Sequence, residues 1–551
     1  MKRKIYRQTI PLVLALILTG MQAMGFYISM KYQTSVHIHE SFRQLWELPK
    51  VLLLCLALLE FVMFYALLRL LFTALERRAG SDIPVSPAIP RWCRGVTGVI
   101  LFLSWLPCLA ASYPGFFNYD VVGQLPQAMY PENQYNSHHP LLNTLIMGKI
   151  ITLGYNLSGQ RDLTVGILLH SLSQMIFCAA VFTCFICFIL RITGRKWVAV
   201  LAGLYYALFP VIAMFSMSTT KDVLCCAILI LCVIRLYWLF ENPDRFLASR
   251  RSCAGLILCV VLLCMLRKNS IYAVVLLALA MLLCFKGYRR KSAAVFGVIL
   301  AVYFLCSRGL FLALDAKAGG MSEAFSVPFQ QIARTYCIYG ETDFEDEELQ
   351  LLSQVGNDNV WKNYNPLLAD HVKNFIDFEP VAASPGRYLK LWLKTGLRHP
   401  REYLMAFLEN TYQAWYPGTS IIIRISDHKI YYFDFDMSLN LERFSKNERL
   451  LEFYEKISKE YYYQKLPGIR LLFSVGAMFW VALITFCYGL WRRDRSIIYP
   501  MLLILAFCLT NLLGPVVLVR YYLMLFYGFP IFLGFLFKKC MPPEETERKN
   551  P

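Results

Sequence analysis

The sequence predicts an α-helical polytopic membrane protein with about twelve transmembrane helices and a mostly helical external module. Of its 551 residues, 57% are hydrophobic and only 17% are charged, and the mean hydropathy is +0.47. A soluble domain would carry about a quarter charged residues. The apolar residues fall in blocks of about twenty, which is the length that crosses a hydrocarbon core of about 30 Å.

Each apolar block should be a helix, because a backbone in lipid has to satisfy its own polar groups. The expected spans are residues 10–29, 51–72, 95–112, 163–190, 197–217, 223–240, 253–266, 271–285, 292–313, 469–490, 497–518 and 522–537. Two of them, 253–266 and 271–285, are short and could form a hairpin that crosses only in part. The basic Met1–Arg7 segment before the first block favours an uncleaved helix over a signal peptide.

Basic residues between the spans predict the orientation. If the N-terminus is inside, the inner loops carry 25 Lys and Arg residues and the short outer loops carry nine. Cytoplasmic loops carry such an excess in membrane proteins. Both termini are therefore expected in the cytoplasm. The expected location of the protein is a plasma membrane, and a bacterial one is favoured. The same clusters explain the net charge of +18, so nucleic acid is not an expected partner.

Four parts follow from this orientation. They are an N-terminal transmembrane module of about nine spans (1–314, with the external loop 113–162), an external soluble module (315–468), C-terminal transmembrane helices (469–538) and a cytoplasmic tail (539–551). Residues 387–415 form an amphipathic stretch that suits either a membrane interface or a small core of its own. The 18 cysteines lie almost all inside apolar blocks, which argues against a disulfide framework or a zinc site.

The loop 113–162 carries the first candidate functional residues. Asp120 directly follows a span, and His138 and His139 begin a short apolar segment. A carboxylate at the membrane surface can act as a general base on a hydroxyl or ligate a divalent cation. Histidine there can bind phosphate when protonated or a metal when neutral. The structural alternative is a solvated loop in which Asp120 caps a helix and the histidines make local hydrogen bonds.

Three further places combine charge with an outer membrane boundary. Lys221 and Asp222 stand where two spans meet, and charges there are costly unless paired or functional. A surface ion pair between them, or a helix cap, is the structural alternative. Arg267-Lys268-Asn269 and Arg520-Tyr521 place cations on the side that the charge rule disfavours. A guanidinium matches the geometry of phosphate. We therefore expect these residues to bind an anion rather than only to extend their charged ends to the membrane interface.

These motifs resemble those of the GT-C superfamily of membrane glycosyltransferases. Tyr119-Asp120 followed by His138-His139-Pro140-Leu141 is similar to the first external loop of protein mannosyltransferases and of the lipid A aminoarabinose transferase. An uncharacterised bacterial group of such proteins resembles the chain more closely, through the motifs Lys221-Asp222, Arg267-x-Asn269, Phe329-Gln330-Gln331 and Arg520-Tyr521. The chain departs from the family pattern at Leu141, where many members have a second proline, and in having two further spans before the one that leads into the Asp120 loop.

The resemblance implies transfer of a sugar from a polyprenyl-phosphate-linked donor in the bilayer to an external glycan or protein acceptor. Asp120 would be the general base or the ligand of a divalent cation, Mg²⁺ or Mn²⁺. His138 and His139 would position the donor or the metal, and Lys221, Arg267 and Arg520 would hold the phosphate. The other substrate-binding residues that it implies are Tyr119, Asp222, Asn269, Gln330 and Tyr521.

Region 315–468 would bind the acceptor. The rival interpretations are a transporter or flippase for lipid-linked glycans, which also needs cations at the membrane boundary, and a glycan polymerase or ligase. A large external module favours an enzyme over a flippase.

Overall fold

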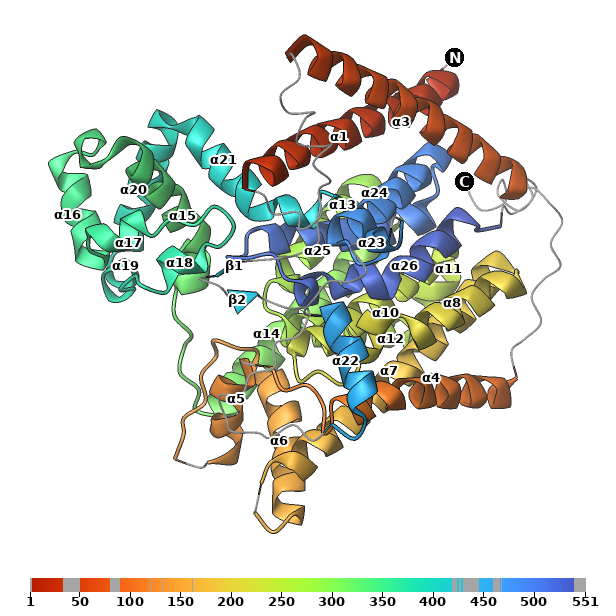
Figure 1. Ribbon diagram of the computed structural model, residues 1–551. Coiled ribbons are helices and arrows are strands. Elements are labelled where there is room, and N and C mark those ends of the chain that lie inside the picture. Colours follow the sequence, from red (N-terminus) through yellow and green to blue (C-terminus); the bar gives the residue numbers. More distant parts are fainter. Residues whose placement is uncertain are drawn as a thin grey trace.

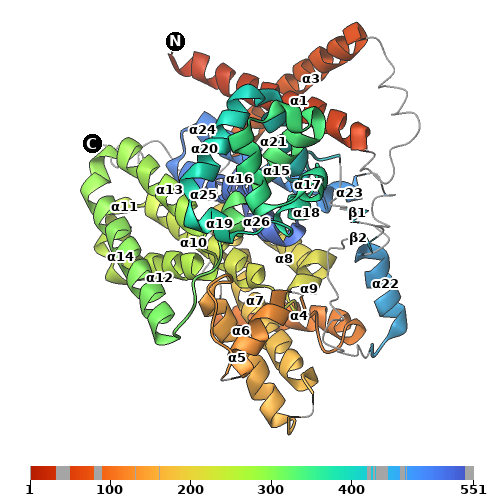
Figure 2. The ribbon, with the colours of Figure 1, turned by 90° about the vertical axis from the view of Figure 1, so that its left-hand side faces the viewer.

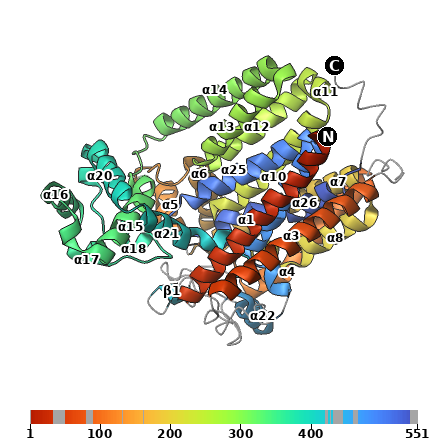
Figure 3. The same ribbon diagram turned by 90° about the horizontal axis from the view of Figure 1, so that it is seen from above.

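The computed structural model contains a bundle of long helices with a smaller helical unit at one end (Figure 1). Seen from above, the long helices run side by side along one direction, and α1 begins at the end opposite the smaller unit (Figure 3). The structure describes residues 2–32, 50–79, 90–118, 120–130, 132–160, 162–418, 424–425, 428–429, 445–458, 466 and 468–539.

Within these described residues, nine helical segments are long and apolar enough to cross a membrane, so the chain is an α-helical membrane protein. They are α1 (Lys2–Tyr32), α3 (Lys50–Ala79), α4 (Arg91–Ala111), α7 (Thr164–Thr193), α10 (Lys221–Glu241), α14 (Arg289–Ala313), α24 (Val475–Arg492), α25 (Arg495–Leu512), and η5 (Val519–Tyr522) continued by α26 (Leu523–Leu536).

The other three expected spans form shorter helices. They are α8 (Lys196–Leu208) with α9 (Pro210–Phe215), α12 (Arg250–Leu266) and α13 (Ser270–Cys284). The expected helix 197–217 is interrupted because Phe209 adopts an extended conformation (φ −71°, ψ 118°) before Pro210. A residue that precedes proline is disfavoured in the helical region, so this break follows from the sequence. The short helices α11 (Pro243–Ala248) and η1 (Lys286–Tyr288) join neighbouring spans, and α23 (Ile469–Leu472) directly precedes α24.

Contacts between helix ends define two faces of the bundle. At one end Lys538 forms ion pairs with Glu241 (2.7 Å) and Asp494 (3.0 Å), and the Trp491 indole donates to the Arg7 carbonyl. At the other end, here called the module face, lie the loops that follow α4, α9, α12, α14 and α25. The basic-rich loops and the other loops therefore occupy opposite ends of the bundle, as the expected order of spans requires.

The smaller unit is a compact helical module with a core of its own. Phe329, Trp361 and Tyr388 are all buried in that core. In Figure 2 this module lies in front of the C-terminal bundle helices. Its helices are α15 (Ser322–Tyr339), η2 (Glu341–Asp343), α16 (Asp346–Val355), α17 (Asp358–Lys362), α18 (Asp370–Lys373), α19 (Glu379–Ala383), α20 (Pro385–Arg398) and α21 (Pro400–Thr411).

The α20 part of the amphipathic stretch 387–415 packs on this core. Tyr388 and Leu391 of α20 are buried against α15, so the second of the two expected alternatives is confirmed for that face of the helix. The opposite face exposes Leu389, Leu393 and Leu397.

Other described parts of region 315–468 pack on the bundle. Tyr412 in η3 (Tyr412–Ala414) is fully buried in the bundle core. The helix α22 (Glu448–Ser458) lies against α4, and the nearby Lys446 amide donates to the Ala110 carbonyl (2.8 Å). Two short antiparallel strands, β1 (Arg424–Ile425) and β2 (His428–Lys429), lie between them in sequence. The compact helical module is therefore smaller than the segment that the sequence suggested.

Loop 113–162 contains two helices, α5 (Asp120–Met129) and α6 (Leu141–Leu157); α5 packs on α6, and α6 packs on the N-terminal half of α7 (Figure 1). Glycines allow the close approach of α6 and α7: a Cβ on Gly154 would lie 2.4 Å from the Gly166 Cα. This packing places the start of α5 and the start of α6 on the module face.

Candidate functional site

Charged side chains from five separate segments meet at the module face. A short parallel bridge between Phe116 and Ser218 brings the chain before α5 alongside the chain before α10. The Asn118 amide continues this pairing by donating to the Thr219 hydroxyl (2.8 Å). The segments that begin α6, end α12 and precede α26 complete the assembly. We call this group the charged cluster; its ionisable side chains are Asp120, His138, His139, Lys221, Asp222, Arg267, Lys268 and Arg520.

Asp120 is the first residue of α5 and is held by cations. Its Oδ2 lies 3.1 Å from Arg520 Nη1 and 3.8 Å from Lys221 Nζ, and its side chain is 11% exposed. Burial raises the pKa of this carboxyl, but the charges of Arg520 and Lys221 outweigh that effect and lower the pKa to about 2. Asp120 is therefore ionised at neutral pH and does more than cap a helix.

Asp222 is fully buried and pairs with Arg267. The Thr220 hydroxyl donates to its Oδ2 (3.0 Å), and Arg520 Nε lies 4.0 Å from the same oxygen. The alternative of a Lys221–Asp222 surface pair is therefore wrong: Lys221 turns to Asp120, and Asp222 lies inside the bundle. Arg520 therefore lies within ion-pair distance of both carboxylates, Asp120 and Asp222.

His139 accepts a hydrogen bond from Lys221, with Nδ1 3.1 Å from Nζ. Burial and the Lys221 charge lower the pKa of His139 to about 3. The imidazole is therefore neutral at pH 7, and phosphate binding through a protonated His139 is not supported. The exposed His138 ring packs edge-on against it, with ring centroids 4.8 Å apart.

Tyr521 lies between two guanidinium groups. The Arg267 and Arg520 Cζ atoms lie 4.9 and 5.1 Å from its ring centroid. Arg267 also donates to Asn511 Oδ1 (2.9 Å), and Asn511 Nδ2 donates to the Tyr521 carbonyl (2.6 Å). These contacts fix Arg520 at the start of η5 with its guanidinium directed toward Asp120.

Three predicted residues are not part of the charged cluster in the described structure. Asn269 is exposed at the start of α13, and its side chain makes no hydrogen bond to the cluster residues. Gln330 is buried in the module, where it donates to the Asn365 carbonyl (2.9 Å). Tyr119 lies outside the described residues.

Two residues that the sequence prediction missed hold the cluster together. Asn118 Oδ1 accepts from Arg520 Nη1 (2.7 Å) and from the Asp120 amide (3.2 Å), which joins the two ends of the chain at the site. Asn511 supports Arg267 and Tyr521. Asn511 could have been found as a polar residue inside an apolar span, which is rare without a function. Asn118 gives no such signal, because asparagine is common in loops.

The charged cluster is better matched to an anion than to a metal ion. Its four cationic side chains (Lys221, Arg267, Lys268 and Arg520) face two carboxylates, which leaves an excess of two positive charges. Among the residues that the structure describes, no group of three or more His, Cys, Asp or Glu side chains could hold a metal. A cation at Asp120 would have to compete with Arg520 and Lys221.

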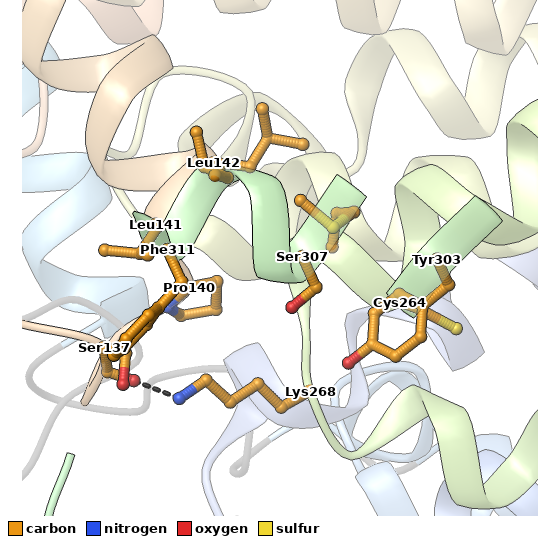
Figure 4. Close-up of a pocket in the computed structure, with 11 residues that line it drawn as sticks. Ser137, Pro140, Leu141, Leu142, Cys264, Lys268, Tyr303, Ser307 and Phe311 are labelled. Carbon is orange, nitrogen blue, oxygen red and sulfur yellow. Dashed lines mark hydrogen bonds between the residues drawn. The ribbon is translucent and has the colours of Figure 1, made fainter. Parts of the chain in front are cut away.

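A cavity of about 130 Å³ adjoins the cluster (Figure 4). It lies between the start of α6 and the ends of α12 and α14 at the module face, and Lys268 reaches across its edge to donate to the Ser137 carbonyl. Its walls are mainly apolar, with the Tyr303 and Ser307 hydroxyls among them.

Comparison with known proteins gives one match. The model of a family described as "Family of unknown function (DUF6020)" matches residues 2–548. No curated protein and no solved structure matches the chain.

Proposed function

Since the chain belongs to DUF6020, a family of unknown function, its activity has to be inferred from the site, and we propose that it is a membrane glycosyltransferase of the GT-C type. It transfers a sugar from a polyprenyl-phosphate-linked donor to a glycan or protein acceptor on the non-cytoplasmic side. The observation that carries this proposal is an ionised carboxylate, Asp120, set among cations that exceed the acids by two charges.

In this reaction the negatively charged Asp120 and the cations of the cluster have different roles. The acceptor hydroxyl oxygen forms a bond to the anomeric carbon of the sugar, and the bond from that carbon to the phosphate oxygen breaks. Asp120 takes the hydroxyl proton, and the leaving polyprenyl phosphate keeps the electron pair. Fixed cations beside a developing phosphate charge stabilise the transition state in a site with little water.

Lys221, Lys268 and Arg520 are the cations that we assign to the phosphate. Arg267 is engaged with Asp222 and Asn511 and stands behind Tyr521, so we assign it to support of the cluster. His139 is neutral and orients Lys221 through its hydrogen bond.

We assign the acceptor to the helical module. The module touches the loop that leads to Arg520: the Ala369 amide donates to the Pro515 carbonyl (2.8 Å), and Asn410 Nδ2 donates to the Gly514 carbonyl (3.2 Å). An acceptor bound between the module and the bundle would lie close to Asp120.

The orientation proposal places the module face outside a bacterial plasma membrane and both termini in the cytoplasm. It rests on the excess of basic residues in the loops at the opposite end of the bundle. The donor then enters from the outer leaflet of the bilayer.

Asp120→Asn in the detergent-solubilised protein tests the base. A general base contributes typically about 10²–10⁴-fold in rate, so we expect a loss of labelled-sugar transfer of that size. Binding of the donor should remain, because Asn keeps the shape and most hydrogen bonds. Asp162→Asn is a matched control, since Asp162 only caps the start of α7 (2.7 Å to the Thr164 amide), and Asn caps as well.

The same assay separates the rival functions. Turnover of Asp120→Asn within about threefold of the wild-type rate would remove Asp120 as the base. A loss that EDTA reproduces in the wild type, and that Mg²⁺ or Mn²⁺ reverses, would make Asp120 a metal ligand instead. No transfer by the wild type in detergent, together with movement of lipid-linked glycan across vesicles, would favour a flippase.

A further inference from the structure

The donor's lipid chain needs a path from the charged cluster into the bilayer. The cavity in Figure 4 begins at Lys268, one of the cations assigned to the phosphate. From Lys268 a series of contacts leads to the base: Lys268 binds the Ser137 carbonyl, His139 lies two residues on, and Lys221 bridges His139 (3.1 Å) to Asp120 (3.8 Å). The cavity is therefore the apolar space next to the proposed reaction centre.

The walls of the cavity suit a branched hydrocarbon with a polar end. Leu141 and Leu142 of α6, Met265 of α12, and Leu310 and Phe311 of α14 line it. Ligand sites are mostly apolar with a few placed polar groups, and here those groups are Lys268 at one edge and the Tyr303 and Ser307 hydroxyls.

The size of the cavity limits what it can hold. An apolar cavity of about 150 Å³ accommodates benzene, which has six carbons. The five carbons of one isoprene unit fit the 130 Å³ available here, and because the cavity is partly open, a second unit would extend out of it. Beyond the cavity, α14 exposes Phe304, Leu305 and Leu312, so the rest of a long chain would lie against a lipid-facing surface.

We infer that the cavity between α6, α12 and α14 is the site for the phosphate-proximal isoprene unit of the lipid carrier, and that recognition of the chain ends there. This inference rests on the proposed function for the identity of the ligand as a lipid phosphate. It adds that the protein distinguishes a branched first unit from a straight chain and is indifferent to total chain length.

Cavity filling provides the first test, with the full-length protein in detergent and citronellyl phosphate as the probe. We expect Leu310→Trp to weaken binding at least tenfold, because the larger side chain occupies the cavity. Leu312→Trp, two residues along the same helix on the exposed face, is the matched control and should change affinity less than twofold. Inorganic phosphate should bind both variants equally, which separates loss of the chain site from loss of the phosphate site.

Chain length and branching provide the second test. Affinities expressed as mole fractions in the micelle should rise from inorganic phosphate to dimethylallyl phosphate. They should then stay within about threefold up to undecaprenyl phosphate, while n-decyl phosphate should bind more weakly than citronellyl phosphate. A steady rise with chain length would overturn the inference. So would Leu310→Trp binding within threefold of wild type in a protein whose thermal midpoint is unchanged.

The binding and transfer measurements distinguish an error in the cavity assignment from an error in the proposed function. Normal binding of lipid phosphates with no effect of Leu310→Trp would overturn the cavity assignment alone. Tight, branch-selective binding without any sugar transfer would overturn the transferase and support the cavity assignment. Absence of binding by every lipid phosphate would overturn both.

Discussion

Asp222 shows at the scale of one residue how the site is built. It is a fully buried carboxylate whose charge is balanced by Arg267, and a hydroxyl and a second arginine lie nearby. Removing one partner of a buried ion pair leaves an uncompensated charge, which typically costs about 3–5 kcal/mol. Arg267 therefore supports the cluster by pairing with the buried Asp222 carboxylate and holding it in place.

This pairing predicts the behaviour of an arginine deletion. Arg267→Ala should lower the thermal midpoint of the purified protein strongly. The double variant Arg267→Ala/Asp222→Asn should recover most of that loss, because the unpaired buried charge is gone. Equal midpoints for the single and double variants would show that Arg267 does not act through Asp222.

His139 predicts a pH dependence of stability. Its pKa is lowered to about 3 in the folded protein by burial and by Lys221, against about 6.5 for an ordinary histidine. Below pH 6.5 His139 takes up a proton in the unfolded chain, whereas in the folded protein it stays neutral until the pH approaches 3. The folded protein therefore loses up to about 1.4 kcal/mol per pH unit from this residue as the pH falls from 6.5 toward 3.

The measurement compares thermal midpoints at pH 7.5 and pH 5.0. His139→Gln removes the titrating group, so its midpoint should fall less than that of the wild type over this interval. Parallel falls in the two proteins would mean that His139 takes up its proton in the folded state as readily as in the unfolded one.

At the scale of elements, short helices and breaks place the functional residues. The interruption at Phe209-Pro210 lets α9 end where Ser218 can pair with Phe116, so Lys221 begins α10 beside Asp120. The turn between α12 and α13 brings Arg267 and Lys268 to the same level. A continuous helix through residues 197–217 would have carried the start of α10 to another depth in the bundle.

The attachment of the module is a second feature at this scale. Arg334 of α15 binds Glu402 (2.9 Å) and Glu409 of α21, and Lys31 at the end of α1 binds the other Glu409 oxygen (3.0 Å). Glu409 is fully buried, and it joins the module to the bundle between the buried Arg334 and the more exposed Lys31. This contact holds the module over the loop that leads to Arg520.

At the scale of the whole molecule, the two faces of the bundle predict accessibility. The module carries Cys337, an exposed thiol whose Sγ lies 3.3 Å from the Trp361 carbonyl. If the module face is external, a membrane-impermeant maleimide should label Cys337 in intact spheroplasts, and a Cys337→Ser variant should lose that label.

Proteolysis gives an independent readout of the same orientation. Protease added to intact spheroplasts should cut within region 315–468 without lysis. Labelling and cleavage that both require lysis would reverse the orientation and place the charged cluster in the cytoplasm.

The sequence by itself determined that this is a helical membrane protein, because apolar blocks of bilayer length can satisfy their backbones only as helices. It also identified most of the charged cluster. Asp120, Lys221, Asp222, Arg267 and Arg520 stand out because a charge at a membrane boundary is costly and is kept for a reason.

Only the tertiary structure decided how these charges pair. Lys221 and Asp222 are neighbours in the chain, yet each finds a partner from a distant segment, since adjacent residues on a helix point in different directions. Asn118 joins the cluster through Arg520, 402 residues away in sequence. The cavity behind Lys268 exists only where three helices meet, and a void between packed side chains leaves no pattern in any one segment.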